Sequence, residues 1–329
     1  MGTEHFRNLP VPFFSQRQND YQWEERYLDE ESAIRLRAAR SSGASGAIWS
    51  EEEHHGRARV IGLPAFFCGM MGKKERRMKK TFLILVALFV LSSLAFAKPY
   101  GEKSRPDSAG DIVFADGTAT AWREGLTLTE EQKKAAVAVI FYAGTECSND
   151  GEHRILGVGL AQNKLGIAWC TSSANAYRKN ITPIRCEADG EAGALTFKGD
   201  LDGSDNFEQM GAFLSDDDTT TEANYPAFYY AKKYVEAEGS NVGGSEFERG
   251  WYLPSLAELF HIWKEWERVN TAIGLCGGTQ FDKGIYWTSS QYPSYTSAAY
   301  LFDFYDGSWG YFSYPSHPCY RVCAVRAFN

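Results

Sequence analysis

Residues 292–320, which we term the aromatic segment, limit most strongly what this chain can build. Eleven of these 29 residues are aromatic, and the segment contains no Lys, Glu, Gln or Met. Rigid aromatic side chains set among Ser, Pro, Gly and Ala make large contacts at low entropic cost, as they do in antibody loops. The composition therefore predicts a binding surface, with a Tyr-rich core segment as the plainer alternative.

The residue types absent from the aromatic segment share a property of the genetic code. Codons that end in a pyrimidine never encode Lys, Glu, Gln, Met or Trp, and within the segment only Trp309 breaks this restriction. The composition therefore indicates that a bias in codon mutation, as well as selection for contacts, shaped this part of the chain.

A secretory signal lies well inside the sequence. Met78 is followed by two lysines and an apolar stretch that ends in Ala-Phe-Ala before Lys98. This order of basic, apolar and small residues is typical of a signal peptide, here residues 78–97. The apolar stretch is too short for a stable membrane span. We therefore expect residues 1–77 to be untranslated, with a genuine cytoplasmic extension as the alternative.

Residues 98–329 would form the mature chain, and their composition bounds its partners. They carry 20 Lys and Arg against 31 Asp and Glu, a net charge of −11. This charge disfavours nucleic acid and anionic membranes as partners. Six cysteines in an exported chain favour disulfides, but their spacing selects no pairing and fits no zinc site. They are Cys147, Cys170, Cys186, Cys276, Cys319 and Cys323.

Catalytic motifs are not recognisable in the mature chain. It has three histidines, His153, His261 and His317, and none lies in a nucleophile and base arrangement. We therefore expect a protein that is not an enzyme and needs no cofactor or metal.

Short strands and a few helices are predicted between frequent turn residues. A capping-box pattern at Thr129 and Gln132 begins one helix, and a second at Ser255 and Glu258 begins another that runs to about residue 273. A third helical pattern covers 222–238, and a turn is expected at Asn163. Strands are predicted at 111–114, 118–122, 137–142, 155–160, 166–170, 285–288, 300–305 and 321–327. The economical fold is a single α+β domain over 98–329.

Four motifs in order carry a family resemblance. They read Gly-Asp-Ile-Val-Phe at 110–114 with Asp-Gly-Thr at 116–118, Trp-Tyr-Leu-Pro-Ser at 251–255 with Glu258, Tyr-Trp-Thr-Ser-Ser-Gln at 286–291, and the end from Arg321 to Phe328. The chain resembles C-type-lectin-fold proteins of the formylglycine-generating-enzyme-like type, and among them the treponemal variable proteins. The resemblance implies a C-type-lectin-like fold. It also implies that a diversity-generating retroelement rewrites codons by adenine mutagenesis within a variable region at about 287–328.

Strand alternation assigns faces within the aromatic segment. In the strand at 300–305, Phe302 and Phe304 lie on one face, which we expect to be buried. Leu301, Asp303 and Tyr305 would then face outward. Residues 311–319 have no regular period and are predicted to form an exposed loop. Trp287 and Trp309 are expected to be structural. The predicted ligand-binding surface comprises Tyr292, Pro293, Ser294, Tyr295, Ser297, Leu301, Asp303, Tyr305, Ser308, Tyr311, Phe312, Tyr314, Ser316, His317 and Cys319.

The function implied is that of an exported binding protein at the cell surface, the outer membrane or the periplasm. We expect a monomer without a transmembrane span, whose ligand is a protein on a host or neighbouring cell. Two alternatives stay open. Cys319 and Cys323 could act as the paired cysteines of a formylglycine-generating-type oxidase, although their spacing is one residue shorter than in that family. A calcium-dependent module could use the oxygen ligands of Asp200, Asp202, Ser204, Asp205 and Glu208, for which an ordinary Asx turn is the plainer interpretation.

Overall fold

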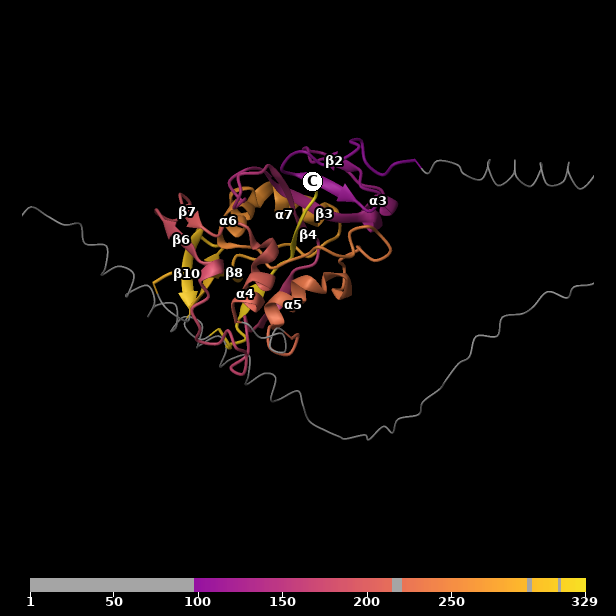
Figure 1. The fold of residues 1–329 in the computed structure, drawn as a ribbon. Helices are drawn as coiled ribbons and strands as arrows, with labels where there is room; N and C mark the ends of the chain where they lie inside the picture. The colour runs from indigo at the N-terminus through magenta and orange to yellow at the C-terminus, as the bar shows by residue number, and fades with distance from the viewer. Residues whose placement is uncertain (1–97, 215–220, 295–297, 313–314) are drawn as a thin grey trace, which may run out of the picture. The chain divides into compact units, whose positions relative to one another are not determined.

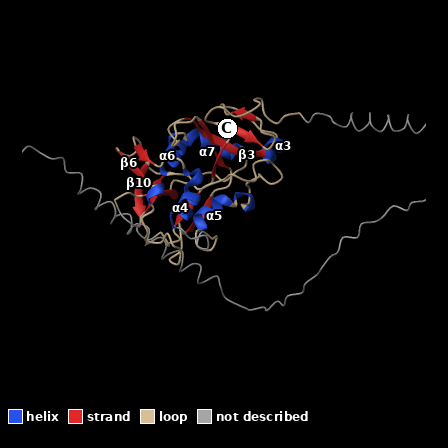
Figure 2. Ribbon diagram, in the orientation of Figure 1, coloured by secondary structure: helices blue, strands red, loops and turns tan. Residues whose placement is uncertain are grey.

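The computed structural model describes residues 98–214, 221–294, 298–312 and 315–329. In these ranges the chain is an α+β unit that combines two five-stranded sheets, a two-stranded hairpin and short helices (Figures 1 and 2). The predicted signal peptide and the segment before it lie outside the described residues, as do Tyr295, Ser297 and Tyr314 of the predicted surface. The coarse fold class predicted from the sequence is confirmed.

The first sheet has the strand order β12-β4-β3-β1-β2, and every pairing in it is antiparallel. Four of its strands follow one another along the chain, and the fifth, β12, comes from the carboxyl-terminal end and lies at the edge beside β4. The tight turn after β1 uses Gly117 at φ +81°, a conformation that favours glycine. The strands are β1 (Asp111–Phe114), β2 (Ala119–Ala121), β3 (Ala136–Gly144), β4 (Arg154–Gly159) and β12 (Val325–Ala327).

The second sheet has the order β10-β9-β8-β11-β5, in which only the pair β8 and β11 is parallel. The chain passes from this sheet to the first between β11 and β12, through Cys323 and Ala324. A separate hairpin, β6 (Cys186–Asp189) with β7 (Thr196–Gly199), lies near β10 in Figure 1. The strands of the second sheet are β5 (Asn163–Ile167), β8 (Ile285–Gln291), β9 (Ala299–Asp303), β10 (Ser308–Phe312) and β11 (Tyr320–Val322).

The helices are short, and α6 is the most deeply buried of those described. Seven of its nine residues are buried, and its side chains share one apolar cluster with Val139 of β3, Tyr286 of β8 and Phe302 of β9. Both predicted capping boxes, at Thr129 and at Ser255, are present. The helices are α3 (Glu130–Ala135), α4 (Asn206–Leu214), α5 (Pro226–Lys232), α6 (Leu256–Lys264) and α7 (Trp266–Leu275), with 3-10 turns η1 (Thr182–Ile184), η2 (Gly203–Asp205) and η3 (Tyr234–Glu236).

The helix predicted from Ser255 to about residue 273 is two helices. Glu265, at φ −98° and ψ 15°, ends α6 and precedes α7. Trp263 stacks on Phe260, while Trp266 contacts other core rings on the far side of the break. Both indoles are partly buried against the core.

Three strand predictions were wrong where distant pairing overrides local signals. Asn163 does not form a turn but begins β5, because it pairs with Val322 of β11. Residues 321–327 are not one strand, since β11 and β12 belong to different sheets. Tyr311 and Phe312 are not in a loop, because they pair with Tyr300 and Ala299 of β9.

The inward face predicted for Phe302 and Phe304 is confirmed, since both are at most 1% exposed. Leu301, predicted to face outward, is instead buried at 5% exposure. Its strand lies between β8 and β10, and Leu301 is opposite Trp287, which covers the same face. Tyr305, beyond the end of the strand, is 72% exposed as expected.

The expected disulfides are absent among five of the cysteines. Each of these is a free, buried thiol, and burial raises the pKa of Cys170, Cys186 and Cys276 to about 12. The apolar core therefore holds these thiols without cross-links. The five are Cys147, Cys170, Cys186, Cys276 and Cys323.

Two alanine substitutions test the division between scaffold and surface. We expect Phe302→Ala to lower the free energy of unfolding by about 3–5 kcal/mol, because it opens a cavity in the core beneath β9. Tyr305→Ala should change it by no more than about 0.5 kcal/mol, because that ring is exposed. Urea denaturation of both variants measures the difference, and similar losses in the two would contradict the assignment.

Candidate functional site

The aromatic segment builds a graded cluster of rings at the edge of the second sheet. Register places Trp309 and Tyr311 of β10 opposite Phe302 and Tyr300 of β9. Tyr292 stacks on Tyr311 with 4.5 Å between ring centroids, and Trp309 lies 5.3 Å from Tyr300. Tyr300 is fully buried, whereas Tyr292, Trp309 and Tyr311 are half-buried. The rings thus anchor in the core and continue to the surface.

The opposite face of the same sheet carries a second group of rings. Trp287 is fully buried, donates its indole N–H to the carbonyl of Ile167 at 2.8 Å and contacts Tyr320 edge-on. Phe312, half-buried on β10, lies 5.4 Å from Tyr320 and 6.1 Å from His317 between ring centroids. The structural role expected for Trp287 is consistent with its burial and its hydrogen bond.

The structure divides the predicted surface residues between two faces instead of gathering them on one. Tyr292 and Tyr311 lie on the face toward α6, and Phe312 and His317 lie on the other. Asp303 and Ser308 are opposite each other beside the turn that joins β9 and β10. Of the rest, Ser294 and Tyr305 are exposed, and Pro293, Ser316 and Cys319 are half-buried.

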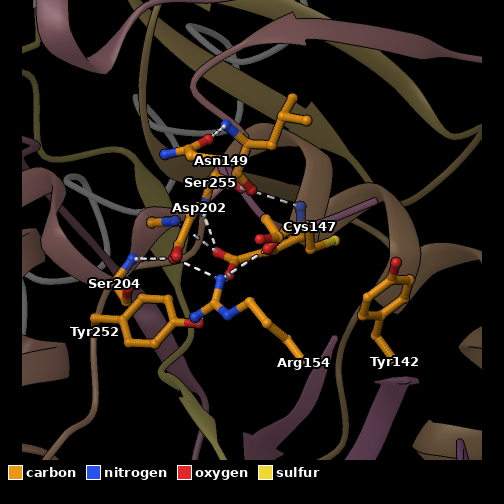
Figure 3. Close-up of polar contacts among 12 residues, drawn as sticks. Tyr142, Cys147, Asn149, Arg154, Asp202, Ser204, Tyr252 and Ser255 are labelled. Atoms are coloured by element: carbon orange, nitrogen blue, oxygen red, sulfur yellow. Dashed lines mark hydrogen bonds and ion pairs between the residues drawn. The ribbon is translucent and has the colours of Figure 1, made fainter. Parts of the chain in front are cut away.

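The sequence did not predict a buried polar cluster, which we term the Glu258 cluster. Figure 3 labels four residues that contact Glu258 or its partners, namely Arg154, Asp202, Tyr252 and Ser255. The Glu258 carboxylate accepts hydrogen bonds from Tyr252 Oη at 2.7 Å and from Arg154 Nη1 at 3.3 Å. It also accepts the backbone N–H of Ser255 at 2.8 Å and that of Gly203 at 3.3 Å. The capping-box pattern predicted the bond to Ser255. No local pattern connects Glu258 with Arg154, which is 104 residues away.

Asp202 completes this cluster as a second carboxylate on the same guanidinium. Its Oδ1 lies 2.5 Å from Arg154 Nη1, and it also accepts the backbone N–H of Ser204. Burial raises the pKa of Glu258 to about 7, and the charge of Asp202 adds to this effect, while Arg154 opposes it. Two carboxylates therefore share one arginine, which favours a proton on Glu258 near neutral pH.

Neither alternative chemistry finds an assembled site in the described residues. Cys323 is fully buried, and burial raises the pKa of its thiol, which disfavours the reactive thiolate. In the proposed calcium loop, Asp202 is bound by Arg154, and Asp200 is buried and accepts a hydrogen bond from Asn149 at 2.8 Å. Among the described residues, no group of three or more His, Cys, Asp or Glu side chains is arranged to hold a metal ion.

Comparisons with known proteins identify no family for this chain. No protein-family model matches the chain, and no curated protein matches it. A solved structure of a fimbrial protein from Bacteroides ovatus is similar with a TM-score of 0.46 and 14% sequence identity, over 67% of this chain and 48% of that one. The chain thus spans about half of that protein. No helix in the described ranges is long and apolar enough to cross a membrane.

Glu258→Gln tests the titration of the buried carboxylate. Because the folded pKa of about 7 lies above the ordinary value of 4.5, its stabilising contribution is complete below pH 4.5 and is lost as the pH rises toward 7. We expect the unfolding free energy of the wild type minus that of the variant to fall by on the order of 1–3 kcal/mol across this window.

The subtraction is needed because other buried groups titrate in the same range. Burial raises the pKa of Asp200 to about 6, which also lowers stability as the pH rises. Burial lowers the pKa of His261 to about 4, which has the opposite sign, since this histidine destabilises the fold when it is protonated. Both groups are common to the two proteins. Chemical denaturation of each from about pH 4 to pH 8 measures the difference, and a constant difference would contradict the raised pKa of Glu258.

Proposed function

We propose that this chain is an exported, surface-displayed binding protein with a C-type-lectin-like fold, whose aromatic segment is diversified through a retroelement to bind varied protein ligands. The observation that carries the proposal is the stacked pair of Tyr292 and Tyr311, with Trp309 packed beside Tyr292 as a structural support. These half-buried rings extend outward from the buried Tyr300 and Phe302, within the part of the chain that avoids Lys, Glu, Gln and Met.

The position of the cluster suits recognition. β10 is an edge strand, so its side chains can change without disturbing a neighbouring strand on that side. The rings beside it on β9 are held in the core, and strands fix the backbone, so little ordering entropy would be lost on binding. Half-buried tyrosine and tryptophan offer an apolar body and a polar tip, which is the chemistry enriched at protein interfaces.

Sequencing the gene together with its neighbouring template repeat tests the diversification. We expect codon differences only at template adenines, and we expect them at half-buried or exposed positions such as Tyr292, Tyr311 and Phe312. The codons of Trp287 and Phe302 should be unchanged, because both side chains are fully buried. Differences spread over all four template bases, or frequent changes at Phe302, would overturn the proposal.

Export is tested separately at the amino terminus. Expression of the gene behind its own upstream sequence, in a host with a functional secretion pathway, should yield a mature chain that begins at Lys98, because the small-residue site precedes it. Mass spectrometry of the isolated protein identifies the first residue. A peptide from residues 1–77 in that sample would refute the assignment of the start.

A further inference from the structure

A groove of about 770 Å³ lies beside β12, the edge strand of the first sheet. Its walls come from the start of β4, from the η2–α4 region, from α5 and from the segment before α6. No residue of the aromatic segment lines it. The groove therefore lies apart from the aromatic segment, although Arg326 and Ala327 of its lining fall within residues 287–328.

The backbone of β12 is open toward this groove. Val325 exchanges both backbone hydrogen bonds with Tyr252, at 2.9 and 3.0 Å, and there the pairing stops as an isolated bridge. Gly250, at φ +86°, turns the chain away before it can pair with the next residues of β12. Phe328 donates its N–H to Ile155 on the β4 side. By the alternation of an antiparallel ladder, the N–H and C=O of Ala327 face the groove.

Arg326 adds a cation that forms no ion pair within 4 Å in the described residues, although the charge of Glu246 acts on it. Its guanidinium lies over the rings of Phe247 and Phe328, at 5.1 and 5.8 Å from their centroids. Its Nε is buried and lacks a hydrogen-bond partner among the described groups. Burial lowers the pKa of this arginine, and the charge of Glu246 offsets only part of that shift. The side chain is thus held in place, partly desolvated, with donors unused.

The remaining charged side chains at the groove limit how much negative charge a ligand can carry. Arg154 and Lys232 are engaged by Asp202 and Glu208. Arg249 lines the groove and is exposed, as are two acids of the lining, Asp150 and Glu152. A doubly charged group would meet repulsion from these acids, whereas a single carboxylate can pair with Arg326 in the bidentate geometry that guanidinium favours. Trp251 and Phe228, both buried, provide apolar wall.

We propose that this groove binds the carboxyl-terminal end of an extended peptide. The peptide adds a short strand to β12 through the N–H and C=O of Ala327, and its terminal carboxylate pairs with Arg326. Strand addition supplies main-chain hydrogen bonds, and capture of a free carboxylate fixes the register. The site lies outside the aromatic segment and does not depend on the proposed function.

Nuclear magnetic resonance of the isotope-labelled protein tests this site with two pools of random tetrapeptides, one with free carboxyl termini and one amidated. We expect the free-carboxylate pool to shift the amide resonances of Gly250 and Ala327, and the amidated pool to bind about tenfold more weakly, because it lacks the charge-assisted bond. Arg326→Gln should weaken the free-carboxylate pool by a similar factor. Arg105→Gln, at an exposed arginine outside the groove, is the matched control and should leave binding unchanged.

Ala327→Pro removes the backbone donor and leaves Arg326 in place, and proline is tolerated on an edge strand whose N–H points outward. This variant should also lose peptide affinity about tenfold, with the thermal transition showing that it folds. Inorganic phosphate is the probe for a simple anion site. Equal binding of the two pools, no shift at Ala327, no effect of Arg326→Gln, or phosphate binding as tight as peptide binding would each overturn the proposal.

Discussion

Both sheets depend on the hydrogen bonds that the buried carboxylate of Glu258 accepts. Through Arg154 it reaches the first residue of β4, and through Gly203 it fixes the turn before α4. The helix that it caps is tied to the second sheet, because Leu256 donates its N–H to Ser290 of β8 at 3.1 Å. Removal of Arg154 would leave both Asp202 and Glu258 without their ion pair, and breaking a buried pair costs about 3–5 kcal/mol in comparable cases. The start of α6 is therefore the junction of the fold.

That junction explains where variation can be tolerated. α6 holds β3, β8 and β9 through one apolar cluster, so the interior strands are fixed by side chains that also contact the helix. β10 is the edge strand of its sheet and pairs there with β9. The side chains of β10 are half-buried between the core and the surface. The edge of the sheet can therefore change its side chains while the Glu258 cluster, far along the sequence, keeps the backbone in position.

Local signals predicted the parts of the fold that are decided locally. The capping boxes at Thr129 and Ser255 were read correctly because their partners lie three residues apart, and the burial of Phe302 followed from strand alternation. The β6–β7 hairpin, the strand at Asn163 and the cluster of Glu258 with Arg154 were missed, because their partners are distant in sequence or lack apolar periodicity. Leu301 was misjudged for the same reason, since only the sheet order places a second aromatic layer over its face.

The codon restriction and the physics of binding act in the same direction under the proposed function. Codons that end in a pyrimidine exclude Lys, Glu, Gln and Met, which are among the side chains that lose most rotamer entropy on burial, about 1.5–2 kcal/mol each. They permit Tyr and Phe, whose rigid rings lose less and contact more. Mutation within such codons therefore leaves out four of the long side chains with high rotamer entropy, although Arg stays accessible. The long, flexible cation of Arg326 lies beyond the aromatic segment, where packing over Phe247 and Phe328 has already restricted its rotamers.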